Sequence, residues 1–554
     1  MSVKDEVMTS DERIAEGARI LAKYKSAKAA LERRVIADEE WWRKTSSGEE
    51  ESTAWLFNAV ANKHADAMDN YPSPAVLPRE EGDSEAARQL SKILPVILDS
   101  SDFEKVYSEV WYDKLKYGAG CYGVFWDPAA HRGKGDVSIK KIDLLNLYWE
   151  GGINDLQSSA NVFYTELWSN DEIRAAYPHA ERLGATPGFD GAKYVTEETV
   201  DESEKSVVVD WYYKRRVGGK CVLHLCKFAG GEVLFCSENE PGCEGGIYAH
   251  GKYPFFIDRL YSVQGSPCGF GMIDVMKGTQ AQIDRLSRAA VKNAELSGAV
   301  RYFIRTDGAV NEEEFADFTS PFVHVHGSRL GDDSLRQIKV SPLDPVFVSI
   351  LQNKITELKE TSGNRDFTQG GTASGVTAAS AIAALQEAGS KLSRDMISAS
   401  YRVFRDAILL AIELIRQFYT APRVFRILGE DGEFSFLSYS GASIAARRAS
   451  AFGYDFGEFA PEFDVKVSAE KRSPFARVTQ NELAKEFYTM GFFSPDRRAE
   501  AAACISMMDF EGKEKLLRRL SQPEGETSSK EEARPAHGAL YGAVKRAAFL
   551  GGEV

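Results

Sequence analysis

The chain has 554 residues, of which 43% are hydrophobic and 27% charged, and its formal net charge at pH 7 is −14. These values predict a soluble protein with several domains and argue against one that binds nucleic acid tightly. Weak, transient contact with DNA remains compatible with them. There is no run of about 18 apolar residues, and the N-terminus is polar and charged, which predicts neither a membrane-spanning helix nor a secretory signal.

Helical periodicity dominates the first part of the chain, and strand-like alternation follows it. Proline residues after Tyr71 should end the first helical region, because proline cannot continue a helix. Helices are expected at residues 10–70, 83–98, 103–117 and 169–178, the last capped by Ser169 or Asn170. Strands are expected at residues 118–126, 136–142, 143–149, 161–168, 206–215, 220–229 and 232–236, with loops at 127–135 and 180–206. The first 265 residues should therefore form an α+β body.

A glycine-bracketed turn, GSPCGFG at residues 265–271, introduces the next helix. This helix is expected at residues 272–296 and should stop at Gly298. A compact insert follows, and then a helix at 345–361 with proline in its first turn. Within the insert, strands are expected at residues 299–305, 321–326 and 334–340, and a short acidic helix at 311–318.

A very long helix is predicted at residues 376–419, because this stretch has no proline and one interior glycine. Apolar residues at steps of mostly three and four define one face. Residues 407–418 are apolar nearly all round, so the two halves of the helix should have different surroundings. After it, strands are expected at residues 423–428, 433–439 and 463–467, loops at 452–463, and helices at 474–490, 494–508 and 511–520. Residues 521–554 have a composition typical of disordered tails.

Three segments and the order of the elements resemble the portal protein of tailed bacteriophages, the ring at one vertex of the head. The segments are YGAGCYGVFWD at residues 117–127, GDVSIKKIDLLNLYW at 135–149 and GFGMI at 269–273. The order is helix, β insert, helix, glycine-rich loop and long helix. The resemblance implies an α+β, portal-like architecture with a wing, paired stem helices, a small β/α clip, one very long helix and a helical crown.

The resemblance also implies a division of the chain into these regions. The wing would comprise residues 1–268 and 420–469, stem helix 1 residues 269–298, the clip residues 299–344, stem helix 2 residues 345–361, the tunnel loop residues 362–377, the long helix residues 376–419, the crown residues 470–520 and the tail residues 521–554. The glycines of the tunnel loop would keep it pliant, and its polar side chains suit phosphate contacts without base readout.

Three sets of site residues follow from this division. The tunnel loop would present Asn364, Arg365, Thr368, Gln369, Thr372 and Ser374 to DNA. The stem would line the channel with Lys277, Asp284, Arg285, Arg288, Lys292 and Glu295. The clip would meet terminase or an adaptor through Glu312, Glu313, Glu314, His324, His326 and Arg329.

The function implied by the resemblance is structural and not enzymatic. The chain would form a homo-oligomeric ring, dodecameric in the family, through which double-stranded DNA is packaged and ejected. Expected partners are the large terminase subunit, a head-tail adaptor, and the major capsid and scaffolding proteins, with no cofactor, metal or membrane. The protein would be assembled in the host cytoplasm and reside in the virion at the capsid portal vertex.

Two other interpretations remain open from the sequence. The first is a zinc-dependent hydrolase built on residues 221–250, which contain Cys221, Cys226, Cys236, Cys243, His224 and His250. No C-x-x-C spacing occurs there and three of the cysteines fall in apolar strands, which favours buried reduced thiols. The second is a phage scaffold or adaptor protein without a channel. A P-loop is disfavoured, because no lysine lies between Gly363 and Gly389.

Overall fold

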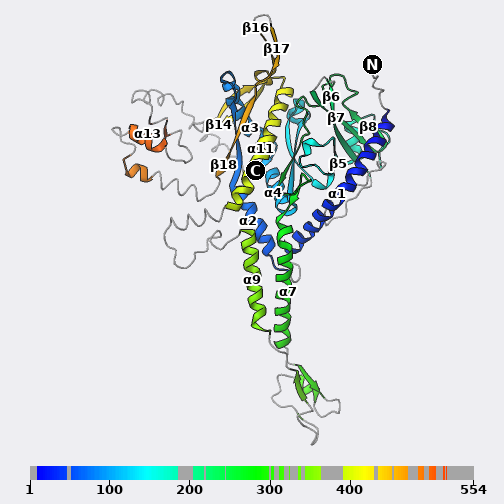
Figure 1. Cartoon of the computed structure of the whole chain (residues 1–554), viewed down its shortest axis with the longest axis vertical. Coiled ribbons are helices and arrows are strands. Elements are labelled where there is room, and N and C mark those ends of the chain that lie inside the picture. Colours follow the sequence, from blue (N-terminus) through cyan, green and yellow to red (C-terminus); the bar gives the residue numbers. More distant parts are fainter. Residues whose placement is uncertain are drawn as a thin grey trace, which may run out of the picture. The chain divides into compact units, whose positions relative to one another are not determined.

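The computed structural model describes residues 9–46, 52–184, 204–217, 220–243, 245–298, 301–304, 311–316, 324, 335–338, 343–363, 391–428, 434–451, 454–471, 485–491, 498–506, 516–517 and 520. The chain divides into two compact units, one of residues 1–427 and 434–470 and the other of residues 428–433 and 471–554. The first unit combines helices with small sheets, as expected of an α+β protein (Figure 1).

The N-terminal helices form where the periodicity predicts them. They are α1 (Ser10–Ser46), α2 (Trp55–Asp69), α3 (Ser84–Ser100) and α4 (Phe103–Tyr117). The prolines after α2 end it, but this segment also forms an unpredicted strand, β1 (Asn70–Pro78). β1 pairs only with β18 (Phe463–Lys471) in a two-stranded sheet, so its prolines lie in an edge strand, where proline is tolerated.

Two larger sheets follow, with strand orders β3-β2-β9 and β4-β5-β6-β7-β8. The predicted strand at 143–149 is wrong in its first half, because the Asp143 carboxylate accepts the Leu145 N–H at 2.8 Å and a 3₁₀ turn forms. Ser169 is the cap of α6 (Asn170–Ala176) and forms a capping box with Glu172. The strands are β2 (Ala119–Asp127), β3 (Asp136–Ile142), β4 (Leu147–Trp149), β5 (Asn161–Ser169), β6 (Lys205–Val217), β7 (Lys220–Ala229), β8 (Glu232–Cys236) and β9 (Phe255–Arg259), and the short helix α5 (Ala130–Gly133) lies between β2 and β3.

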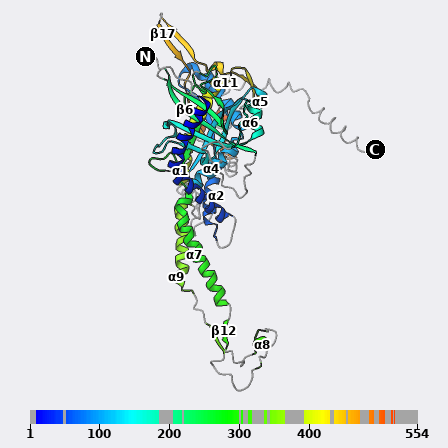
Figure 2. The same ribbon diagram turned by 90° about the vertical axis from the view of Figure 1, so that its right-hand side faces the viewer.

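The predicted helix pair around the insert is α7 (Met272–Gly298) and α9 (Pro345–Ser362), and the two helices lie side by side (Figures 1 and 2). We call α7 and α9 together the arm. Strands β10 (Tyr261–Ser262) and β11 (Gly269–Phe270) pair just before it. In the insert, β12 (Arg301–Ile304) pairs antiparallel with β13 (Leu335–Ile338), and α8 (Glu312–Ala316) is the predicted acidic helix. Apart from residue 324, the predicted strand at 321–326 lies outside the described residues.

Helix α11 (Lys391–Phe418) is the described part of the predicted long helix. It packs against β2 and β9 on one side and contacts β1 and α2. The ring of Phe404 lies 5.4 Å from that of Phe103 in α4, which joins α11 to the core. The half from residue 407 onward is the more deeply buried, in agreement with its nearly continuous apolar sequence. Residues 376–390 lie outside the described part.

The C-terminal predictions are met in part. β14 (Arg423–Leu428) and β15 (Phe434–Tyr439) form as expected. The loops predicted at 452–463 are wrong over most of that range, because β17 (Tyr454–Phe459) pairs antiparallel with β16 (Arg447–Ala451), and such pairing is not visible in local composition. Helix α13 (Arg498–Ser506) falls within the predicted helix at 494–508, whereas the tail at 521–554 lies outside the described residues. Within the described residues, no helix is long and apolar enough to cross a membrane.

Candidate functional site

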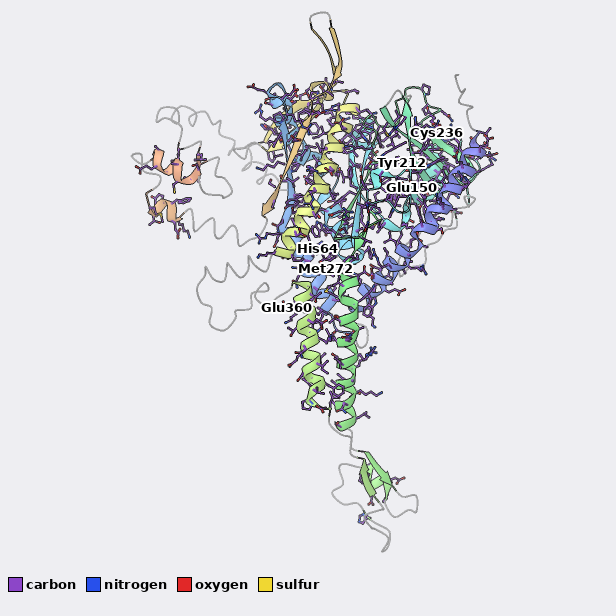
Figure 3. The ribbon with its side chains drawn as sticks, in the orientation of Figure 1. His64, Glu150, Tyr212, Cys236, Met272 and Glu360 are labelled. Atoms are coloured by element: carbon purple, nitrogen blue, oxygen red, sulfur yellow. The ribbon has the colours of Figure 1, made fainter. Side chains whose placement is uncertain are left out.

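The arm carries the predicted stem residues, and the structure separates them into two groups. Figure 3 labels Met272 at the start of α7 and Glu360 near the end of α9, and these mark the end of the arm that joins the sheets and helices of the first unit. Lys277 and Asp284 are engaged by other residues of the subunit. The remaining members are exposed, namely Arg285, Arg288, Lys292 and Glu295.

Asp284 lies inside the subunit. Its side chain is buried and accepts hydrogen bonds from the Thr53 N–H at 2.9 Å and the Thr53 hydroxyl at 2.8 Å. Gln280, one helical turn earlier, donates to Asp284 at 2.8 Å and accepts the Leu56 N–H at 3.0 Å. The two side chains therefore satisfy backbone donors at the start of α2, which fixes α2 on α7. Sequence spacing could not reveal this partner, which lies 231 residues away along the chain.

The exposed charged residues follow one face of α7. Arg285, Arg288, Lys292 and Glu295 recur at steps of three and four, which places them on neighbouring turns. Arg288 Nε also donates to the Asp284 carbonyl at 3.4 Å. Three cations and one carboxylate make this face net positive, although the whole chain is acidic. A face of this kind can contact phosphate oxygens without reading bases.

The end of the arm next to the insert exposes apolar side chains from both helices. Val291 is 59% exposed, Val346 51%, Val348 48% and Phe347 42%. Consecutive residues of a helix point about 100° apart, so these side chains project from several sides of the helix pair. Scattered exposed apolar residues need no explanation, but this number of them at one end of a helix pair indicates association with other chains. We call these four residues the distal apolar patch.

Close backbone packing joins the arm to the sheets and helices of the first unit. Gly118, at φ +84°, ends α4 in the left-handed conformation, and a Cβ there would lie 2.2 Å from the carbonyl carbon of Phe270. A Cβ on Gly271 would lie 2.2 Å from the Lys116 carbonyl oxygen, and one on Gly269 would lie 2.0 Å from the Tyr261 carbonyl oxygen. The glycines of the segments 117–127 and 269–273 therefore face one another where α4 ends and α7 begins.

Ionic contacts surround this junction. Arg34 of α1 donates to the carbonyl oxygens of Tyr117 and Gly269. Lys277 Nζ lies 2.8 Å from Asp274 Oδ1 and 3.0 Å from Asp38 Oδ1, so it links α7 to α1. Asp38 is fully buried, and among the described residues its second oxygen, Oδ2, has no hydrogen-bond partner. Burial, followed by the charge of Asp274, raises the pKa of Asp38 to about 6, although Lys277 and Arg34 oppose this.

The raised pKa of Asp38 predicts a pH dependence of stability. Because the pKa in the folded chain lies above the unfolded value, folding favours protonated Asp38, and this contribution is fully present below about pH 4 and lost as pH rises through 6. Asp38→Asn should therefore gain stability over the natural chain between pH 4 and pH 7, by roughly 1–3 kcal/mol. Thermal unfolding across this range measures the difference, and Asp69→Asn, at an exposed site, is the control. A difference that does not change with pH would refute the prediction.

The end of α9 and the start of α11 meet at one point on α2. Lys63 Nζ donates to the Ser393 hydroxyl at 2.8 Å, and Ser393 donates to Asp66 Oδ2 at 2.7 Å. Gly363, which ends α9, lies next to Leu392, because a Cβ at this glycine would be 3.3 Å from the Leu392 side chain. The end of α9 and the start of α11 are therefore neighbours. We call the Lys63–Asp66–Ser393 set the α2 clamp.

The tunnel-loop residues and part of the clip lie outside the described residues. These are Asn364, Arg365, Thr368, Gln369, Thr372, Ser374, His326 and Arg329. Of the other predicted clip residues, Glu312, Glu313 and Glu314 lie in α8. His324 is exposed, and its N–H and Nδ1 lie 2.6 and 2.9 Å from a Glu314 carboxylate oxygen.

The four cysteines of the zinc interpretation do not come together. Cys226 of β7 lies opposite Cys236 at the end of β8, and both are buried. Cys221 is exposed, and its odd spacing from Cys226 places it on the other face of the strand. Among the residues that the structure describes, no group of three or more histidine, cysteine, aspartate or glutamate side chains is placed to hold a metal ion.

Comparison with known proteins identifies the chain at the level of a family. The family model for the phage P22-like portal protein matches residues 64–540, which is most of the chain and includes the arm, the insert and α11. No curated protein matches the sequence.

Proposed function

Because the chain belongs to the phage P22-like portal protein family, we propose that it forms the ring at the portal vertex through which double-stranded DNA enters and leaves the head. Members of the family are structural components of the virion and not enzymes. The finer proposal is a homo-oligomeric ring, dodecameric in the family, that is assembled in the host cytoplasm with scaffolding and major capsid proteins. The force for DNA movement would come from the separate terminase motor.

The observation that supports a ring most directly is the arm. In the isolated subunit α7 and α9 cover each other on one side only, and the distal apolar patch remains exposed. Neighbouring copies of the same arm would cover it, since identical helix pairs placed around an axis bury equivalent surfaces at every boundary. Repetition around the axis would also turn each exposed charge of α7 into a ring of charge.

The proposed channel contacts are the exposed members of the stem set, with Asp284 assigned to the subunit interior. Rings of Arg285, Arg288 and Lys292 would attract the DNA backbone, and Glu295 and the acidic balance of the chain would prevent tight binding. The tunnel-loop residues 364–374 remain a proposed polar contact with DNA, and the insert remains the proposed docking site for terminase and the head-tail adaptor.

Native mass spectrometry with electron microscopy of the purified full chain tests the ring. We expect a closed oligomer of about twelve subunits with a central hole, and expect Phe347→Glu combined with Val346→Glu to reduce it to monomers, because each boundary would then bury unpaired charges. Gln352→Glu, which adds one charge at an exposed polar site of the same helix, should keep the ring. Unaltered rings in the double variant would contradict the assignment of this surface.

A further inference from the structure

Two cysteines face each other on the five-stranded sheet, beneath α1 (Figure 3 labels Cys236). Cys226 and Cys236 are register partners in the antiparallel pair β7–β8. The Ser237 N–H donates to the Leu225 carbonyl at 2.9 Å, so the neighbouring pair of residues is the hydrogen-bonded one. Cys226 and Cys236 therefore occupy a non-hydrogen-bonded position, because the two kinds of pair alternate along antiparallel strands.

This position has the geometry that a disulfide needs. Cα atoms of non-hydrogen-bonded pairs lie about 4.5 Å apart with both side chains on the same face. Disulfides span Cα separations of about 4.4–6.8 Å. The two sulfur atoms could therefore join without movement of the strands.

A cation is placed against one sulfur of the pair. Arg13 of α1 donates from its NH1 nitrogen to Cys236 Sγ at 3.2 Å, and the same nitrogen lies 2.7 Å from Glu238 and 3.4 Å from the Tyr213 hydroxyl. Hydrogen bonding with Cys226, the Glu238 backbone N–H and the charge of Arg13 hold the pKa of Cys236 below its ordinary value, against burial and the Glu238 carboxylate, whereas the pKa of Cys226 is raised. Cys236 is therefore the member of the pair that lies against a cation.

Other buried cysteines of the described structure lack this arrangement. Burial raises the pKa of Cys268 to about 12 and that of Cys121 well above its ordinary value, so both stay as neutral thiols. Arg13 and Tyr213 also line an open cleft of about 230 Å³. The cleft therefore gives small molecules access to Arg13, which contacts Cys236, although Cys236 itself is only 3% exposed.

We propose that Cys226 and Cys236 form a peroxide-sensitive dithiol that closes to a disulfide across β7 and β8. The Cys236 thiolate attacks one oxygen of hydrogen peroxide, the O–O bond breaks, and the released hydroxide takes a proton to become water. Cys226 then attacks the sulfur of the Cys236 sulfenic acid, forms the S–S bond, and gives its proton to the departing hydroxide. One peroxide is reduced, two thiols are oxidised and two waters are released. This chemistry is independent of any DNA channel.

The disulfide would have a consequence for a particle that leaves the cell. Thiols stay reduced in the cytosol, whereas disulfides persist outside it. If the chain has the proposed function, the cysteines of the five-stranded sheet would be reduced when the particle is assembled. They would become cross-linked after the particle is released from the cell, without a change in the strand register.

The test exposes the purified full chain to a modest excess of hydrogen peroxide, blocks the remaining thiols, and maps the products by tandem mass spectrometry. We expect a Cys226–Cys236 linkage and a thermal unfolding midpoint raised by several degrees. Cys226→Ser should accumulate sulfenic acid at Cys236, trapped with a dimedone probe, and Arg13→Gln should slow its formation several-fold, since it removes the cation that favours the thiolate. The Cys221→Ser control should still form the linkage.

Two results would overturn the proposal. One is oxidation at the exposed Cys221 while Cys236 stays reduced in the folded chain. The other is trapping of sulfenic acid at Cys121 or Cys268 as fast as at Cys236, which would show that the Arg13 contact has no chemical effect.

Discussion

Replacing Lys114 by methionine is expected to lower the free energy of unfolding by about 3–5 kcal/mol. Lys114 Nζ lies 2.9 Å from Asp258 Oδ1, with both side chains essentially unexposed, and it also donates to the Ser400 hydroxyl at 2.5 Å. These contacts join α4, β9 and α11 in the core. Methionine fits the space of the lysine stem but leaves Asp258 as a buried charge without its cation. Urea denaturation of the purified chain, followed by tryptophan fluorescence, measures the loss.

Two further variants show whether the uncompensated charge is the cause. Lys114→Met combined with Asp258→Leu should recover most of the lost stability, because removing both charges also removes the cost of burying one alone. Glu85→Gln, which breaks the exposed pair between Glu85 and Arg88, should cost at most about 1 kcal/mol. A double variant as unstable as Lys114→Met would instead point to lost packing around Trp111, whose ring lies 4.4 Å from Lys114 Nζ.

Replacing Gly271 by alanine is expected to destabilise the chain by about 3 kcal/mol or to prevent its folding. The added methyl group would meet the Lys116 carbonyl oxygen at 2.2 Å, and backbone cannot move aside as a flexible side chain can. The start of α7 would therefore shift away from the end of α4. Thermal unfolding measures the loss of stability, and native mass spectrometry shows whether the variant still forms oligomers.

The matched control for this substitution lies in α7, the helix that begins directly after Gly271. Gly278 is in the interior of α7, and apart from its chain neighbours and the backbone of its own helix, no described atom lies within 4 Å of the position that a Cβ would take. Gly278→Ala should therefore raise stability by about 1 kcal/mol, since alanine is the better helix former. Similar losses in the two variants would mean that loss of glycine freedom, and not the close approach to α4, decides the outcome.

Local patterns predicted most of the elements correctly. The limits of α4, β3, β7 and β8 follow directly from a change of period at Tyr117 and from turn residues between strands. The sequence predicts a glycine-bracketed turn at residues 265–271, and the structure adds that Gly269 and Gly271 pack against Gly118. The tertiary fold brings the segment that contains Gly118 next to this turn. The spacing of residues along the chain cannot predict such a contact.

The roles of single charged residues were harder to predict. Lys277 and Asp284 fall on the same helix as the exposed Arg285 and have the same kind of pattern. Lys277 and Asp284 have partners within the subunit because α1 and the start of α2 approach one side of α7. Asp38 contacts Lys277 there, and Thr53 contacts Asp284. Lys114 does not stand out in the sequence, where it is one charge among many in an amphipathic helix. Burial of a charge depends on long-range packing and has no local signal.

The α2 clamp also bears on how such proteins can diversify. Gly363 at the end of α9 and Ser393 in the first turn of α11 both lie close to Lys63 of α2. Substitutions at Lys63, Asp66 and Ser393 must therefore stay compatible with one another as such chains diverge, because a change at one of them leaves a polar partner unsatisfied.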